Sequence, residues 1–263
     1  MVDVDPYELK KNDLKIDLKV KSDANYFLTK LFKGLKKYES NSDWINYCTN
    51  VRKKYPILID KMINEKKYVN SYYFVDALSK LTKKNDSIIT DMGFSFTTAH
   101  QAFEIKGNQK FYTNSGHAPM GWGLCAAIGA YYAQKKSKSN IICLTGDGGF
   151  NMNIQELQTL VNYKIPVKTF ILNNHIYGIT KAFQKTNFQG REEACGPKGY
   201  NPPDFIDVAN AYKVKTFRIN KNSEIEKILN EVLKYKGPVV CDVNCHEFHT
   251  YEPKLIGWKT PIE

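Results

Sequence analysis

Short apolar runs alternate with longer amphipathic segments from about residue 71 onward. The apolar runs, which predict buried strands, occur at 87–90, 110–113, 140–145, 167–173, 214–218 and 238–243. The segments between them have helical spacing and lie at about 71–83, 96–104, 121–135, 153–164, 203–212 and 223–235. This alternation predicts an α/β fold, a doubly wound and mainly parallel sheet with helices on both faces.

The first 70 residues lack this alternation. Residues 1–20 are charged and extended in pattern, 24–38 have apolar side chains at helical spacing, and about 42–55 predict a second short helix. They hold too little apolar material for a core of their own. We therefore expect 1–37 to be the end of an upstream domain, 38–70 to be a helical linker and 71–263 to be the main domain.

The composition is that of a globular protein with one large domain or two small ones. The chain has 263 residues, 42% of them hydrophobic, and no run approaches the 18 apolar residues of a membrane span. The start lacks the apolar core of a signal peptide. Six cysteines are scattered, and the spacing of Cys241 and Cys245 is not that of a zinc site. We expect reduced cysteines in a cytoplasmic protein that does not enter a membrane.

The net charge of +11 raises the question of a nucleic-acid partner. Residues 1–84 hold 18 Lys/Arg against 11 Asp/Glu, but the lysines are dispersed and no base-stacking motif accompanies them. We therefore expect no nucleic acid and interpret the charge as a solvated, lysine-rich surface. Such a surface would also attract an anionic cofactor or substrate.

Polar residues that could carry chemistry are concentrated between Gly146 and Asn174. The sequence Gly-Asp-Gly-Gly follows one predicted strand, Asn-Asn ends the next, and a helix expected to begin near Asn153 joins them. In parallel sheets, ligands bind beyond the carboxyl ends of the strands. A turn with three glycines lets the backbone approach a ligand closely, and its N–H groups suit a phosphate.

An acid and a side-chain amide at two strand ends also suit a metal ion. Asp147 supplies an anionic oxygen and Asn174 a neutral one, and Mg²⁺ prefers a few hard protein oxygens completed by phosphate and water. Taken singly, a GDGG turn and an Asn-Asn cap are common structural features. Neither G-x-G-x-x-G nor the GK[ST] of a P-loop is present here. The combination predicts a site for a metal-bound diphosphate.

The succession of strand, GDG, helix, strand and NN resembles the thiamine diphosphate fingerprint. Asp147 and Asn174 are 27 residues apart, which is the spacing in that family. Residues 113–133, TNSGHAPMGWGLCAAIGAYYA, resemble the segment that contacts the cofactor pyrimidine in acetolactate synthases and related enzymes. Residues 2–32 resemble the last part of their central domain, of which 1–37 would then be a remnant. The chain resembles the C-terminal, diphosphate-binding part of an acetolactate-synthase-like enzyme.

This resemblance implies a set of ligands for the cofactor and its metal. The side chains of Asp147 and Asn174 and the backbone carbonyl of Ile176 would bind Mg²⁺. Gly148 and Gly149 would approach the diphosphate through their backbone. The full set of residues expected to bind the cofactor is Ser95, Ala118, Met120, Gly146, Asp147, Gly148, Gly149, Asn174 and Ile176.

The resemblance also implies contacts to the two rings of the cofactor. Met120 stands at the position of a bulky apolar residue that wedges between the rings and forces a bent conformation. A long side chain with three rotatable bonds suits this wedge, although the same residue taken alone would be read as core. Ala118 would offer its backbone carbonyl to the pyrimidine amino group.

Some positions depart from plain acetolactate synthases. Phe94 and Ser95 stand where those enzymes have Gln and His, and only Ser95 can still donate to a phosphate oxygen. Phe183 stands where a Trp helps to select the second substrate, and residues 179–197 are similar to carboligases found with sugar-modifying enzymes. His117 and His175 lie near the site in sequence, where substrate contact and a packing role are both open.

The catalytic residue is not among those matched. In the family, thiamine diphosphate becomes reactive when a glutamate hydrogen-bonds to its aminopyrimidine, and that glutamate lies on an N-terminal pyrimidine-binding domain of another subunit. We therefore expect it on a missing domain or a partner chain. The resemblance implies a homo-oligomer and no turnover by this chain alone.

The predicted function is the thiamine diphosphate- and Mg²⁺-binding part of a carboligase that decarboxylates a 2-oxo acid. Pyruvate is the expected donor and acetolactate the default product. One alternative is a related carboligase or decarboxylase with another acceptor, such as a keto-sugar. Another is a non-catalytic module that binds the cofactor without turnover. A neighbouring coding region for a pyrimidine-binding domain would separate an enzyme from such a module.

Overall fold

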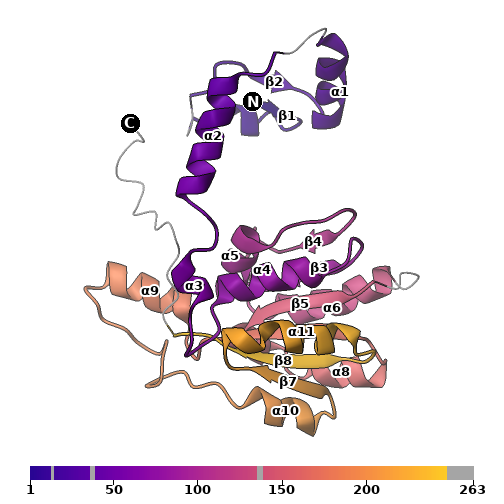
Figure 1. Cartoon of the computed structure of the whole chain (residues 1–263), viewed down its shortest axis with the longest axis vertical. Helices are drawn as coiled ribbons and strands as arrows, with labels where there is room; N and C mark the ends of the chain where they lie inside the picture. Colours follow the sequence, from indigo (N-terminus) through magenta and orange to yellow (C-terminus); the bar gives the residue numbers. More distant parts are fainter. Residues whose placement is uncertain (13–14, 36–38, 135–138, 248–263) are drawn as a thin grey trace. The chain divides into compact units, whose positions relative to one another are not determined.

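The computed structural model describes residues 1–12, 15–35, 39–134 and 139–247. The chain divides into two compact units, Met1–Tyr55 and Pro56–Glu263, which are described separately. Figure 1 shows the helices and strands of each unit. The assignment of 1–37, 38–70 and 71–263 to a remnant, a linker and a cofactor domain stays a prediction.

The first unit is small, and its two α-helices bury none of their residues. Its elements are β1 (Val2–Asp3), η1 (Glu8–Lys10), β2 (Val20–Lys21), α1 (Ala24–Gly34) and α2 (Ser42–Lys54). The two strands pair in parallel. Each helix begins at a side-chain cap, in which Asp23 or Asn41 accepts a backbone N–H of the first turn. The first helix ends at Gly34, and residues 36–38 of the predicted helix lie outside the described residues.

The second unit contains a six-stranded parallel sheet, which confirms the predicted fold class. Its strands are β3 (Ser87–Thr90), β4 (Lys110–Tyr112), β5 (Ile141–Gly146), β6 (Val167–Asn173), β7 (Lys215–Ile219) and β8 (Val239–Asn244). Their order in the sheet is β4-β3-β5-β6-β8-β7. After β3 the chain moves out to β4 and then returns to β5 on the other side of β3. The switch in strand order, where α/β sheets bind ligands, therefore lies between β3 and β5.

Helices cover both faces of this sheet (Figure 1). The helices of this unit are α3 (Asp60–Ile63), α4 (Ser71–Leu81), α5 (Phe94–Ala102), α6 (Trp122–Ala133), α7 (Asp147–Met152), α8 (Glu156–Asn162), α9 (Gly178–Asn187), α10 (Phe205–Ala211) and α11 (Ile225–Lys234), with a 3-10 turn η2 (Asn222–Glu224). Of these, α9 buries none of its residues and joins neither core of the sheet. The sequence pattern does not predict α9, and residue 135 of the helix expected at 121–135 lies outside the described residues. None of the helices in the described part of the chain is long and apolar enough to cross a membrane.

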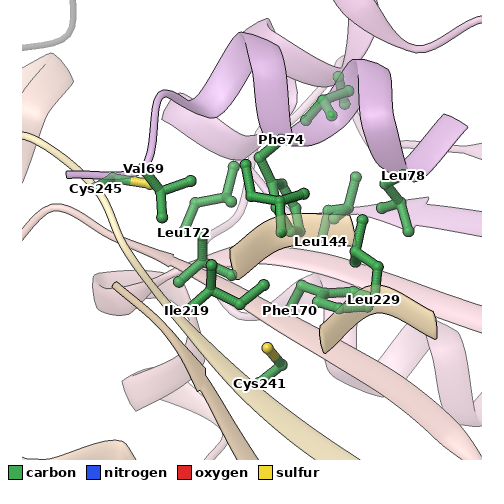
Figure 2. Close-up of a cluster of buried hydrophobic side chains, with 14 of the residues drawn as sticks. Val69, Phe74, Leu78, Leu144, Phe170, Leu172, Ile219, Leu229, Cys241 and Cys245 are labelled. Atoms are coloured by element: carbon green, nitrogen blue, oxygen red, sulfur yellow. The ribbon is translucent and has the colours of Figure 1, made fainter. Parts of the chain in front are cut away.

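The central strands β3, β5, β6 and β8 send alternate side chains into two separate cores. Figure 2 shows one core, in which Phe74 and Leu78 of α4 pack against Leu144, Phe170 and other strand residues. The second core lies between the opposite face of the sheet and α6, α8 and α10. All seven residues of β6 are buried, as expected for a central parallel strand covered on both faces.

One polar side chain is buried near the amino end of the central strand. Lys168 of β6 donates to the backbone oxygens of Tyr235, at 2.5 Å, and Gly237, at 2.7 Å. These carbonyls follow the last turn of α11, where a cation satisfies orphaned acceptors. Burial lowers the pKa of Lys168 to about 8. Its contacts therefore tie a helix end to the sheet, at the strand end opposite the predicted cofactor site.

Candidate functional site

Asp147 and Asn174 lie where the sequence places them, directly after β5 and β6. These strands are neighbours, with Gly146 of one in register with Leu172 of the other. Both site residues are 3% exposed. They line a small cavity of 80 Å³ whose lining residues are Met92, Gly93, Phe94, Met120, Gly146, Asp147, Gly148, Gly149, Asn174, Ile176, Tyr177, Gly178, Ile179 and Thr180. The structure thus gathers most of the predicted cofactor residues around one cavity.

The Asp147 carboxylate is buried with one oxygen unused. Its Oδ2 atom has no hydrogen-bond partner among the described residues. Burial raises the pKa of Asp147 to about 6, although the Gly148 N–H, the Tyr200 hydroxyl and His175 act in the opposite direction. A buried carboxylate in this condition is costly unless a cation or a hydrogen-bond donor joins it. The chemistry of this oxygen therefore fits a metal ion.

The two asparagines at the end of β6 have different surroundings. The Asn173 amide donates to Asp242 of β8 at 3.1 Å, and its oxygen accepts the backbone N–H of His175 at 3.2 Å. Asn173 therefore ties the loop to the neighbouring strand, whereas Asn174 lines the cavity. His175 has a positive φ of 62° and points its ring toward Asn244, with Nε2 at 3.3 Å from Oδ1.

The GDGG stretch opens a helix rather than forming a turn before one. We expected a helix beginning near Asn153, but α7 begins at Asp147 and a second helix, α8, begins at Glu156. The helix predicted at 153–164 corresponds to α8, whereas the predicted turn was wrong, because tertiary packing holds α7 although its two glycines weaken helix propensity. Phe150, the first large side chain after the glycines, is 1% exposed and packs edge-on against Phe205.

Glycine is required by space at two positions of this stretch. A Cβ atom at Gly148 would lie 2.3 Å from the ring of Tyr177, and one at Gly149 would lie 2.3 Å from Asp91 Oδ2. At Gly146 a Cβ would meet nothing within 4 Å. Tyr177 and Asp91 therefore pack directly against the backbone of α7. Such close approach to the backbone is what a cradle of main-chain N–H groups around a ligand requires.

Asp91, which the sequence pattern does not single out, joins three parts of the site. Its carboxylate accepts the Met92 N–H at 2.8 Å, the Gly121 N–H at 3.1 and 3.0 Å, and the Thr145 hydroxyl at 2.8 Å. Burial raises the pKa of Asp91 despite these bonds. The residue follows β3 directly, as Asp147 follows β5. That shared position at a strand end is the signal that could have found it.

The protein comparisons decide what this arrangement is. The family described as "Thiamine pyrophosphate enzyme, C-terminal TPP binding domain" matches residues 91–243, which is more than half of the chain. The chain belongs to this family. Its cofactor is thiamine diphosphate, as predicted, and Mg²⁺ is the usual partner of this domain.

Several relatives of this thiamine pyrophosphate enzyme domain are acetolactate synthase large subunits. The chain is 32% identical over 261 residues to the probable large subunit of Methanococcus aeolicus, covering 92% of this chain and 42% of the relative. It is 30% identical over 247 residues to that of Cyanidium caldarium, covering 92% and 41%. For isozyme 2 of Escherichia coli (strain K12) the identity is 28% over 252 residues, covering 96% and 44%. The chain spans less than half the length of these relatives.

Three further residues predicted to bind the cofactor, Met120, Ala118 and Ser95, differ in how close they lie to the cavity. Met120 is 42% exposed and overhangs the cavity, since its Cε atom lies 3.0 Å from where a Cβ of Gly148 would be. Ala118 is exposed with a positive φ of 51° and does not line the cavity. Ser95 is buried, and its hydroxyl donates to the Met92 carbonyl at 3.3 Å. Ser95 is therefore not brought together with the other residues, and its role stays a prediction.

The aromatic departures from the acetolactate synthase pattern line a second, larger space. Phe94 and Phe183 border a cavity of 460 Å³ that also includes Asn174 and Ile176. Lys181 lies at the same cavity, where Glu192 and Glu247 pair with its ammonium group. His117 is exposed and lines neither cavity. The larger cavity is continuous in its lining with the Asp147 site through Asn174 and Ile176.

The pKa of Asp147 leads to a stability prediction for the protein without cofactor. A carboxyl whose pKa rises from 3.8 to about 6 on folding favours the folded state only while it is protonated. The free energy of unfolding should therefore fall by roughly 3 kcal/mol as the pH rises from about 4 to about 6. In the presence of a chelator, Asp147→Asn should therefore be more stable than wild type at pH 7, and the two should converge near pH 4. Urea unfolding at a series of pH values checks this, and a pH-independent difference would contradict it.

Proposed function

We propose that this domain holds the diphosphate of its cofactor through Mg²⁺, with the side chains of Asp147 and Asn174 and the backbone carbonyl of Ile176 as protein ligands. The observation that carries this proposal is the buried, unpartnered Oδ2 of Asp147 beside Asn174. Ile176 is 4% exposed and lines the same cavity. Three protein oxygens completed by phosphate and water are what Mg²⁺ prefers.

The glycines and Met120 would position the rest of the cofactor. Backbone N–H groups of Gly148 and Gly149 at the start of α7 offer donors to a diphosphate, where the positive end of the helix adds to the attraction. Met120 reaches over Gly148 and is exposed enough to meet a ligand. It would separate the two cofactor rings and favour the bent conformation. The carbonyl of Ala118 would accept the pyrimidine amino group, and Ser95 would need a different rotamer to reach a phosphate.

For the longer protein of which this domain is typical, we propose a carboligase that decarboxylates a 2-oxo acid, with pyruvate as the first donor to test. When bound, thiamine diphosphate supplies the electron sink for decarboxylation. This chain binds and orients the cofactor, whereas the activating glutamate would come from a pyrimidine-binding domain, in trans from a partner subunit. The relatives named as acetolactate synthase large subunits support this proposal. A homo-oligomer would bring the two halves together.

The 460 Å³ cavity favours a second candidate, a carboligase with an acceptor larger than pyruvate. Phe94 and Phe183 replace the polar and Trp side chains of plain acetolactate synthases, and Phe183 is 58% exposed. Lys181 at this cavity is paired with Glu192 and Glu247, and Lys185 lines the cavity as well. The size of the cavity and its aromatic lining suit a larger carbonyl compound such as a keto-sugar.

Titration calorimetry of the 263-residue chain tests the metal-bound diphosphate directly. With Mg²⁺ present, thiamine diphosphate should bind at least about tenfold more tightly than in excess chelator, because the metal screens the diphosphate and anchors it to Asp147. Thiamine without the diphosphate should show no such dependence on metal. Equal affinity for thiamine diphosphate with and without Mg²⁺ would contradict the proposed site.

A further inference from the structure

Tyr200 carries a buried hydroxyl group that the proposed chemistry does not yet use. The residue is 8% exposed, and its hydroxyl has no hydrogen-bond partner among the described residues. Apart from four threonine hydroxyls, the other buried side-chain oxygen in this condition is Asp147 Oδ2. The two groups lie close together, because each acts on the other's pKa, and the Asn151 side chain also lies near the Tyr200 hydroxyl. Two unpartnered oxygens thus meet at the proposed metal site.

The backbone around Tyr200 is folded onto the site by local hydrogen bonds. The N–H groups of Gly199 and Tyr200 both donate to the Gly196 carbonyl, at 2.8 and 2.7 Å. The Tyr177 N–H donates to the Cys195 carbonyl at 3.0 Å, which joins this segment to the loop after β6. Gly199 leaves no space for a side chain, because a Cβ there would lie 2.4 Å from Ala194 Cα. Backbone hydrogen bonds and close packing therefore fix the conformation of residues 195–200 between α9 and α10.

The ring of Tyr200 is connected through Tyr177 to the glycines proposed to bind the diphosphate. It packs on the ring of Tyr177, with 3.9 Å between centroids and 31° between planes. Tyr177 in turn covers Gly148, whose missing side chain makes room for it. Phenylalanine would fill the same volume at residue 200 without burying a hydroxyl that lacks a hydrogen bond of normal geometry, and such a hydroxyl is unfavourable in the folded protein. Packing alone therefore does not explain the hydroxyl.

We propose that Tyr200 is a positioning residue of the metal–diphosphate site, whose hydroxyl donates a hydrogen bond to the oxygens gathered there once the site is filled. This inference rests on the proposed function of Asp147. Before the cofactor binds, Oδ2 of Asp147 has no partner among the described residues, and the Tyr200 hydroxyl faces Asp147 and Asn151 without a hydrogen bond of normal geometry. When Mg²⁺ and diphosphate arrive, the carboxylate gains a cation and the hydroxyl gains an anionic acceptor. Cofactor binding is thereby coupled to the order of residues 195–200.

The first test separates the hydroxyl from the ring. In Tyr200→Phe, thiamine diphosphate should bind about tenfold more weakly in the presence of Mg²⁺, as expected for one lost hydrogen bond to a charged acceptor. Its stability without cofactor should equal or exceed that of wild type, because an unpaired hydroxyl has been removed. A purely structural tyrosine would show the opposite, a less stable protein with unchanged affinity. Tyr212→Phe, at a partly buried tyrosine in the second core, is the matched control and should change neither quantity.

A second measurement, amide hydrogen exchange, reads the coupling in wild type and compares it with Tyr200→Phe. In wild type, Mg²⁺ and thiamine diphosphate together should slow hydrogen exchange at the Gly199 and Tyr200 amides, and the slowing should be smaller in Tyr200→Phe. Thiamine diphosphate with chelator should leave these amides unchanged. Wild-type binding with unaltered exchange and unaltered affinity in Tyr200→Phe would overturn the role of Tyr200 alone. Absence of metal-dependent binding by wild type would overturn the proposed site as well.

Discussion

Asp147→Ala is expected to abolish magnesium-dependent binding of thiamine diphosphate, with affinity at least about 100-fold below that of wild type. Asp147 contributes the anionic oxygen of the proposed ligand set, and the other two protein oxygens are neutral. The described residues contain no group of three or more His, Cys, Asp or Glu side chains that could hold a metal ion without a ligand. Mg²⁺ and diphosphate should therefore bind as a pair, and losing Asp147 should remove both.

The same substitution should leave the fold intact, which makes the binding result interpretable. Removing a buried carboxylate with an unpartnered oxygen relieves a cost in the cofactor-free protein. Asp207→Ala on the exposed side of α10 changes the net charge equally and should bind like wild type. Calorimetry in the presence of Mg²⁺ provides the comparison. Wild-type affinity in Asp147→Ala would remove this residue from the site.

Gly149→Ala is expected to destabilise the protein by roughly 3 kcal/mol, which is at the upper end for added volume in a packed interior. The new methyl group would lie 2.3 Å from Asp91 Oδ2 and 3.1 Å from the Thr145 hydroxyl. Asp91 cannot retreat without losing its bonds to Gly121 and Thr145. The conflict is therefore with a fixed hydrogen-bond network rather than with the end of a flexible side chain. Denaturant unfolding measures the change.

Gly146→Ala, three residues earlier in the same stretch, is the matched control. A Cβ at Gly146 meets nothing within 4 Å, and its φ of −87° and ψ of 166° are open to any residue. We expect a change in unfolding free energy within about 0.5 kcal/mol. If both alanine variants lost the same stability, the crowding around Asp91 would not be the cause.

The fold was predictable because the strands of the second unit have a recognisable sequence pattern. Runs such as 141–145 and 167–172 are short, apolar and rich in β-branched residues, as central parallel strands must be when both faces are covered. Where prediction failed, tertiary contacts overrode local propensity. The glycines of α7 disfavour a helix that the packing of Phe150 nevertheless holds. Conversely, α9 is amphipathic but buries none of its residues, and no helix is predicted there from the sequence.

The site was predictable only where chemistry coincides with a strand end and a short chain separation. Asp147 and Asn174 each follow a predicted strand, so their convergence could be inferred from parallel topology alone. Asp91 bonds to groups 30 and 54 residues away, and Tyr200 reaches the site from a loop without periodic structure. Their partners become visible only when the chain is folded. The buried hydroxyl of Ser95 shows the reverse case, in which position in the sequence does not fix where a side chain points.

The strand order has a consequence for how the polypeptide is made. In the sheet β7 pairs with β8 and not with an earlier strand, and β8 lies between β6 and β7. During synthesis, β7 therefore has no place to dock until residues 239–244 have left the ribosome. Until then, one side of β6, whose residues are all buried in the folded protein, stays an open edge that favours pairing with other nascent chains. Because β8 pairs with both β6 and β7, we expect nascent chains that end before Val239 to associate more readily than the full-length chain.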